Sequence, residues 1–502
     1  MTRELLYLGI DAGSSVTKAA MFNARGSLIA RADCRSAIVR GESGRVEMDP
    51  QAAREIFERV LRELLEAAPV RGAELGGIGI TGAMVGAWLV DGAGAPVARG
   101  INWEDCRAQP SIDARIAEDP AFLSTIFASS GSALQSGCTL PLLAWFDAHE
   151  PELLDRAAAV LGYKDMLRFW LTGEMAADET EASVAPGDTR ARGFSAAMLD
   201  HFRLAHRAGL LPAVRPSDAL AGRVTAEAAG RCGLGEGTPV AVGAGDVPAN
   251  VVGAGALAPG SLTLVLGTTC MLGVTHDRPV FDPPDLGLLF PLPRQRWFRA
   301  MVNVAGTLAL DWALDTLCPD WGQDAGRYER AERTISEVPP GAGGVTFLPY
   351  LSESGIIAPV IDPTARAEFA GLSPGRGRAQ MLRAVYEGVG FAIADLVEAL
   401  APGPGELRII GGGARSRVWV QMIADILDRP VTILEGEEFG ARGAAMLAAA
   451  ATAPRGAADP LFEMAPRGKL RVLPDPARHA AYADALRRYR AHRDTRARRT
   501  PD

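Results

Sequence analysis

Two segments that lie about half the chain apart follow the same plan. Each consists of an apolar strand, a turn of glycine and two small hydroxyl residues, and a second apolar strand. The two turns are Gly13-Ser14-Ser15 and Gly267-Thr268-Thr269. Such internal similarity predicts a duplicated domain in which one hairpin loop from each copy faces a shared cleft. The flanking strands are predicted at 5–10 and 16–23 for the first turn and at 261–266 and 270–276 for the second.

The elements around both hairpins alternate between strands and helices, which predicts an α/β fold. After a third strand over 27–35, Asp49 and Pro50 mark the start of a helix that extends to Leu65. A strand over 77–80 follows this helix. In the second half we expect a strand over 408–410 and helices over 384–399, 419–427 and 441–451. The last of these is rich in alanine, which permits close packing against a neighbour.

A region rich in glycine and proline, 236–260, separates the two halves. Its apolar pieces, 240–242 and 251–252, favour a strand and a helix joined by tight turns over a flexible linker. We therefore expect an N-terminal domain over 1–245, a C-terminal domain over 246–455 and an extension over 456–502.

Composition narrows the classes of function. The 502 residues carry a net charge of −8, which gives no general attraction to nucleic acid, and the arginines near the C-terminus are typical of a solvated helix end. The six cysteines form no Cys-x-x-Cys pair and have no histidine cluster beside them, so we expect neither structural zinc nor a disulfide framework. From this use of cysteine we expect the protein to reside in a reducing compartment, the cytoplasm. No stretch approaches the length needed to span a bilayer, and the N-terminal apolar run is too short for a signal peptide.

The run Gly77–Gly82 fits the spacing Gly-x-Gly-x-x-Gly of a dinucleotide site. That fingerprint must follow a strand and open a helix. Here the glycines lie within an apolar run that continues to Val90 and a turn at Asp91-Gly92, so we reject a nicotinamide site.

The first glycine turn has the chemistry of a phosphate site. Gly13, Ser14 and Ser15 expose backbone N–H groups that bind phosphate oxygens, and Lys18 adds a positive charge. Asp11, at the strand end, is a candidate ligand of Mg²⁺. Turns of this composition also occur in ordinary hairpins, but together with the second turn, Gly267-Thr268-Thr269, the first gains weight, because two such loops can hold a triphosphate from both sides.

Two further sites carry a functional and a structural alternative. Gly411, Gly412 and Gly413 join a strand to a helix, and such a turn either lets the backbone approach a nucleotide or is a plain connection. Asp246 lies on a glycine-flanked loop at the domain junction. It is a candidate general base and a second candidate Mg²⁺ ligand, and the alternative is a turn-forming aspartate before Pro248.

Taken together, these segments resemble the FGGY family of carbohydrate kinases over roughly residues 5–450. The resemblance implies a duplicated, actin-like (ribonuclease H-like) α/β fold with an interdomain cleft, and ATP with Mg²⁺. It implies that residues 7–15 and 267–269 are the two phosphate loops and that Asp246 is the catalytic base. It also implies that Gly411, Gly412, Gly413 and Ser416 belong to the adenosine motif.

The sugar side departs from the family pattern. Trp103, Asp105 and Arg107 match the family's Trp-x-Asp-x-Arg segment, which approaches the substrate in relatives, although the two charged residues also suit a simple salt bridge. Met84 lies where xylulose kinases carry Gln-Met-His, but its neighbours here are alanine and valine. Val247 follows the base, where asparagine or glutamine is common. Leu142 and the segment 355–357 replace further polar family residues. Fewer polar groups predict unusual or relaxed specificity.

The function that this resemblance implies is ATP-dependent phosphorylation of a small sugar or polyol, with a ketopentose such as xylulose or a C4–C5 polyol as the acceptor. The alternative is a nucleotide-binding sensor or regulator of the same fold without catalysis, for which the altered sugar side is the support. The resemblance also suggests a homodimer.

Overall fold

The computed structural model describes residues 5–68, 75–303, 305–324, 326–352 and 355–497. The first half contains a seven-stranded sheet in the order β12-β13-β6-β1-β2-β3, with β14 paired to β6. Its strands are β1 (Leu6–Ala12), β2 (Val16–Asn23), β3 (Leu28–Arg35), β6 (Leu75–Gly82), β12 (Leu220–Arg223), β13 (Pro239–Ala241) and β14 (Ala244–Gly245).

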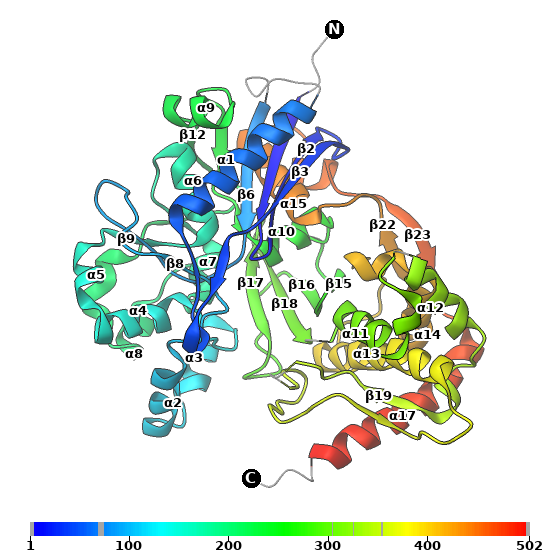
Figure 1. Cartoon of the computed structure of the whole chain (residues 1–502). Helices are drawn as coiled ribbons and strands as arrows, with labels where there is room; N and C mark the ends of the chain where they lie inside the picture. Colours follow the sequence, from blue (N-terminus) through cyan, green and yellow to red (C-terminus); the bar gives the residue numbers. More distant parts are fainter. Residues whose placement is uncertain (1–4, 69–74, 304, 325, 353–354, 498–502) are drawn as a thin grey trace.

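The second half contains another seven-stranded sheet, in the order β17-β18-β16-β15-β21-β22-β23. Its strands are β15 (Leu262–Leu266), β16 (Cys270–His276), β17 (Leu288–Leu292), β18 (Arg296–Asn303), β21 (Leu407–Ile410), β22 (Val431–Leu434) and β23 (Gly468–Val472). Figure 1 shows the two halves side by side, with α10 and α15 at their junction.

The predicted duplication is confirmed by the pairing of the strands. In the first sheet, β2 joins β1 and β3 antiparallel, β6 lies parallel to β1 and to β13, and β12 closes the edge antiparallel. In the second sheet, β16, β15, β18, β21, β22 and β23 repeat each of these relationships. This is the duplicated α/β architecture expected from the sequence, with β1–β2 and β15–β16 as the equivalent hairpins.

Helices α10 (Asp246–Gly253) and α15 (Phe439–Thr452) form the junction, and small residues allow their close approach. A Cβ atom on Gly9 of β1 would lie 1.7 Å from the carbonyl oxygen of Ala441, and one on Gly79 of β6 would lie 1.9 Å from that of Ala444. The alanine-rich helix therefore packs directly on the backbone of the first sheet. The glycines of the dinucleotide-like run belong to β6 itself, which supports their exclusion as a cofactor loop.

The other predicted elements are present with shifted ends. Helix α1 (Pro50–Ala67) is capped at its N-terminus by Asp49, whose side chain accepts hydrogen bonds from the Gln51 and Ala52 N–H groups. Helix α13 (Arg378–Leu400) begins six residues before the predicted 384–399 helix. Helix α14 (Arg417–Leu427) follows β21, and α17 (Pro476–Ala497) ends the described chain. Within the described ranges, no helix combines the length and apolar character needed to cross a membrane.

Candidate active site

Two carboxylates meet at the carboxyl edge of the first sheet. Asp11 lies near the end of β1, opposite Thr81 of the parallel strand β6. On the other side of β6, Ala244 and Gly245 of β14 pair with Thr81 and Gly82, and Asp246 follows directly as the first residue of α10. The topology therefore brings together two residues that are far apart in sequence.

Burial is the main cause that raises the pKa of both groups. Burial raises the pKa of Asp246 to about 7, and the negative charge of Asp11 contributes to the rise. Burial also raises the pKa of Asp11 to about 6, with Lys18 opposing and Glu438 adding to the effect. A carboxyl group with a pKa near neutrality is suited to accept a proton at physiological pH.

A buried series of hydrogen bonds and an ion pair holds the residue before Asp246 in place. The Gly245 N–H donates to Thr180 Oγ1 at 2.9 Å, and the Thr180 hydroxyl donates in turn to Asp178. Asp178 is ion-paired with Lys164, and all of these side chains are buried. Asp178 also caps the short helix α7 (Glu179–Val184). The sequence resemblance covered these segments, but it did not indicate their contact with Gly245.

The first glycine turn is closed by its own backbone, since the Gly13 N–H donates to the Val16 carbonyl at 3.1 Å. Ser14 is half-buried and its hydroxyl oxygen accepts hydrogen bonds from Trp103 Nε1 at 3.0 Å and from Asn102 Nδ2 at 3.2 Å. Ser15 is exposed. The predicted phosphate loop and the predicted sugar residue Trp103 are therefore in direct contact.

The second glycine turn lies beside the triple glycine. The Gly267 N–H donates to the Thr269 carbonyl at 3.0 Å, and the side chains of Thr268 and Thr269 are exposed. The preceding strand, β15, pairs with β21, whose end leads into Gly411. A Cβ atom on Gly411 would lie 2.6 Å from the Leu266 carbonyl oxygen, and its φ of 96° also requires glycine. In this structure Ser416 caps helix α14, since its hydroxyl accepts the Trp419 N–H at 3.0 Å.

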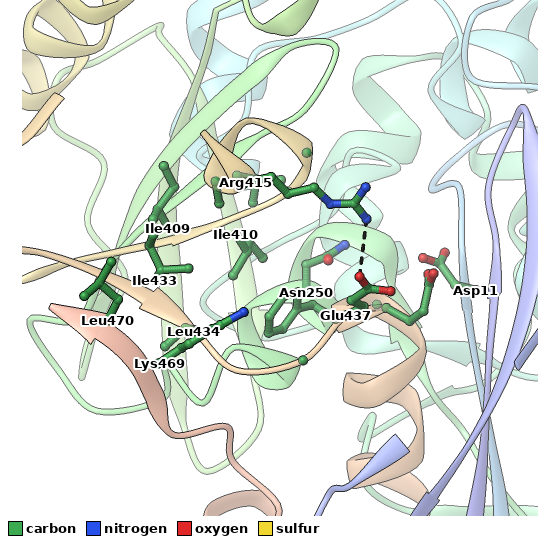
Figure 2. A pocket seen from close by; sticks show the side chains of 18 of the residues that line it. Asp11, Asn250, Ile409, Ile410, Arg415, Ile433, Leu434, Glu437, Lys469 and Leu470 are labelled. Atoms are coloured by element: carbon green, nitrogen blue, oxygen red, sulfur yellow. Dashed lines mark hydrogen bonds and ion pairs between the residues drawn. The ribbon is translucent and has the colours of Figure 1, made fainter. Parts of the chain in front are cut away.

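A cavity of about 610 Å³ lies between the halves of the molecule (Figure 2). Asp11 and Lys18 line it from the first hairpin, and Val265 lines it from the second. The apolar side chains of Ile409, Ile433 and Leu470 lie at one end and Asp11 lies at the other (Figure 2). Gly411 and Gly412 also line the cavity, whereas 13–15, 267–269 and Asp246 are not among its described lining residues.

Charged side chains at and beside this cavity form ion pairs. Lys18 Nζ lies 2.9 Å from Glu438 Oε2, and Arg31 of β3 pairs with both Glu437 and Glu438. Arg415, just after the triple glycine, pairs with Glu437 at 3.4 Å (Figure 2). Ion pairs between the first sheet and the loop before α15 therefore link the two halves.

The predicted sugar residues divide into an exposed one and buried ones. Trp103 is 39% exposed, whereas the Asp105 side chain is fully buried and Arg107 nearly so. Asp105 binds Arg107 through both carboxylate oxygens and accepts the Val46 N–H at 2.7 Å. In this structure the two charged residues are therefore paired with each other. This is the salt bridge that the sequence left as an alternative, although it is buried and not at the surface.

Met84 is also buried, and it covers Gly245, the residue before Asp246. A Cβ atom on Gly245 would lie 2.3 Å from the Met84 sulfur, so methionine occupies the space where a side chain would otherwise stand. Val247 packs against the same apolar cluster. The wall next to Asp246 is thus apolar on this side.

The two duplicated sheets have the architecture of an actin-like phosphotransferase. The N-terminal domain model of the FGGY family of carbohydrate kinases matches residues 6–253, and its C-terminal domain model matches residues 262–452. The chain belongs to the FGGY family of carbohydrate kinases. It is an ATP-dependent kinase that phosphorylates a hydroxyl of a small sugar or polyol.

Curated relatives match the chain over nearly its full length. It is 32% identical to an erythritol kinase of Brucella abortus, over 97% of this chain and 96% of the relative. It is 31% identical to a xylulose kinase of Escherichia coli, over 95% and 96% of the two chains. Among solved structures, a xylulose kinase from Rhodospirillum rubrum superposes with a TM-score of 0.86 at 28% identity, covering 98% of each chain.

Proposed function

We propose that this kinase transfers the terminal phosphoryl group of ATP to a hydroxyl of a ketopentose or of a C4–C5 polyol, with Asp246 as the base. The observation that carries the proposal is the position of Asp246 beside Asp11, with its pKa raised to about 7. The similarity to proteins named erythritol kinase and xylulose kinase supports the choice of acceptor.

Phosphoryl transfer asks the protein mainly for positioning and for neutralisation of charge. In our proposal Asp246 accepts the proton of the acceptor hydroxyl while the oxygen of that hydroxyl forms a bond to the γ-phosphorus of ATP. The bond between that phosphorus and the bridging oxygen of ADP breaks, and ADP leaves with the electron pair. The proton then passes from Asp246 to water. The buried chain through Thr180 keeps the residue before Asp246 in place during these steps.

For the nucleotide, we place the triphosphate between the turns 13–15 and 267–269, with Lys18 beside it. The exposed threonines of the second turn and the half-buried Ser14 of the first are available to phosphate oxygens. The adenosine lies near Gly411, Gly412, Gly413 and Ser416 in this proposal. A cavity with an apolar end and a charged end suits a ligand that carries an aromatic ring and an anionic tail.

Asp11 and Asp246 are the groups that we expect to hold Mg²⁺. Within the described residues, no group of three or more His, Cys, Asp or Glu side chains is arranged to hold a metal ion unaided. Mg²⁺ does not need one, because it usually binds one or two carboxylates together with substrate phosphates and water. The hard oxygen donors of the two aspartates therefore fit. When bound, the ion neutralises charge on the phosphates.

On the acceptor side, the exposed indole of Trp103 offers an apolar face for the C–H groups of a small polyol. Met84 and Val247 add an apolar wall beside the base. Such a wall forms no hydrogen bonds with the hydroxyl groups of the acceptor and so distinguishes acceptors poorly by their hydroxyl groups. A direct contact of Asp105 or Arg107 with the acceptor remains a prediction, since both are engaged in their own ion pair.

A panel of ketoses and polyols, assayed for ADP release in a coupled assay, tests the proposed acceptor class. We expect at least one four- or five-carbon acceptor to stimulate ADP release well above the rate without an acceptor. Bound ATP with no stimulation by any member of the panel would favour a sensor or regulator without catalysis. A homodimer and a cytoplasmic location remain predictions. All six cysteines lie within the described ranges, and each is a free thiol.

A further inference from the structure

We propose that Trp103 and Asn102 orient the Ser14 hydroxyl so that it donates its hydrogen to the nucleotide, and that acceptor and ATP therefore bind cooperatively. Trp103 and Asn102 are positioning residues in this account, and the Ser14 hydroxyl is the group that they orient. The inference rests on the proposed function, because it assigns the acceptor to Trp103 and the phosphates to Ser14.

The donors and acceptors in this cluster are determined by chemistry. The indole nitrogen of Trp103 only donates, so its contact of 3.0 Å makes Ser14 Oγ the acceptor. The amide of Asn102 is oriented by its own oxygen, which accepts the Glu104 N–H at 3.1 Å. Its Nδ2 atom is therefore the one that donates to Ser14 at 3.2 Å.

These two bonds leave the hydroxyl with one remaining capacity. A serine hydroxyl has two acceptor lone pairs and one hydrogen. Because Trp103 and Asn102 occupy both lone pairs, the hydrogen must point to a third partner. Among the described residues, no acceptor takes it. Phosphate oxygens only accept, so a hydroxyl prepared in this way suits them and does not suit a ligand donor.

The backbone of the segment that supplies the two donors is held by hydrogen bonds. The Asn102 N–H donates to the Val46 carbonyl at 2.9 Å, and the Asp105 N–H donates to the Asn102 carbonyl at 3.1 Å. The buried Asp105–Arg107 pair fixes the next turn of the chain. This gives the two charged residues a role in placing Trp103. Trp103 itself is 39% exposed, and beyond the backbone its indole N–H is held by the hydrogen bond to Ser14.

Coupling follows from that combination of a fixed backbone and an exposed ring. An acceptor packed on the indole face restrains the ring and keeps its N–H directed at Ser14. The cost of ordering the hydroxyl is then met before ATP arrives, so ATP binds more tightly. Linkage requires the reverse effect to be equal, and bound ATP must tighten the acceptor by the same factor.

The test uses a non-hydrolysable ATP analogue, whose Kd is measured with and without a saturating acceptor that supports turnover. In the native enzyme we expect the acceptor to tighten the analogue severalfold. Trp103→Phe keeps an aromatic face but loses the N–H. We expect it to weaken the analogue roughly three- to tenfold when the acceptor is bound, as for one lost hydrogen bond, and to bring the coupling close to one.

A double-mutant cycle separates orientation from general damage. With Ser14→Ala in place, Trp103→Phe should have almost no further effect on the analogue, and Asn102→Ala should behave like Trp103→Phe. Additive effects, or unchanged coupling in a folded and active Trp103→Phe enzyme, would overturn the inference and leave the proposed function intact. Failure of every acceptor to support turnover in the native enzyme would overturn the proposed function, and with it this inference.

Discussion

Lys18 of the first hairpin and Glu438 of the loop before α15 form an ion pair across the junction, with Nζ and Oε2 2.9 Å apart. Lys18 is the cation that we assign to the phosphates, and Glu438 is an acidic group that would compete for it. Glu438 also raises the pKa of Asp11. Nucleotide binding therefore has to work against Glu438.

Glu438→Gln should consequently lower the KM for ATP. The pair is partly exposed and worth about 0.2–1 kcal/mol, so we expect a decrease of at most about fivefold, and a smaller one at high salt. Glu437→Gln is the matched control, because Glu437 pairs with Arg31 and Arg415 and not with Lys18. An unchanged or higher KM for ATP in Glu438→Gln would contradict the role given to Lys18.

The pKa of Asp246 predicts the pH dependence of the rate. A base must be ionised, so kcat/KM should fall about tenfold per pH unit below a pH of about 7 and level off above it. Asp11 contributes to the raised pKa, so the residual activity of Asp11→Asn should show its inflection at a lower pH. A pH–rate profile measured in both enzymes checks this, and an inflection that does not move would separate the two carboxylates.

The same shift predicts that Asp246 reduces folding stability at alkaline pH. Its folded pKa of about 7 lies above the ordinary value of 3.8, so its favourable contribution is complete below the unfolded pKa and is lost as the pH rises through 7. Asp246→Asn should therefore melt at a higher temperature than the native protein at pH 8, and the gain should disappear near pH 4. Thermal melts at the two pH values measure this, and equal Tm values at pH 8 would refute it.

Thr180 should matter for both stability and rate. In Thr180→Val the buried Gly245 N–H loses its acceptor, which costs about 1–3 kcal/mol in the free energy of unfolding. Displacement of Asp246 should lower kcat more than it changes the KM for the acceptor. Thr180→Ser retains the hydroxyl and should restore both quantities. Urea unfolding and steady-state kinetics measure the two effects, and a native kcat in Thr180→Val would remove the positioning role.

Gly79→Ala tests the close packing of α15 on the first sheet. The added methyl group would lie 1.9 Å from the Ala444 carbonyl oxygen, so the helix has to move, and we expect a loss of about 1–3 kcal/mol or more. Gly92→Ala is the control, since a Cβ atom there meets nothing within 4 Å. Urea midpoints compare the variants, and equal destabilisation by both would contradict the account of the junction.

Local patterns predicted most of the secondary structure. The strand 16–23 and the strand 270–276 have the predicted ends, and Asp49 caps α1 as its position before Pro50 indicated. The repeated turns indicated the duplication that the strand order confirms. The strand ends and the helix cap depend on neighbours in sequence, and the duplication shows as a repeated local pattern, which is why the sequence was sufficient.

Long-range contacts of the site could not be predicted in the same way. Thr180 contacts Gly245 over 65 residues, and Asn102 contacts Ser14 over 88 residues, and no local pattern marks either pair. Asp105 and Arg107 showed the opposite problem. Their spacing suited both a sugar site and a salt bridge. The structure shows that the two side chains are buried and paired with each other, which the spacing alone could not indicate.

Asp246→Asn tests the central claim most directly, in an assay of ADP release with the best acceptor of the panel. The control is Asp428→Asn, the same change at an exposed left-handed position after α14, where asparagine is well tolerated. We predict that Asp246→Asn loses at least about a hundredfold in kcat, as for removal of a general base, while Asp428→Asn retains native turnover. Unchanged turnover in a folded Asp246→Asn enzyme would contradict the account.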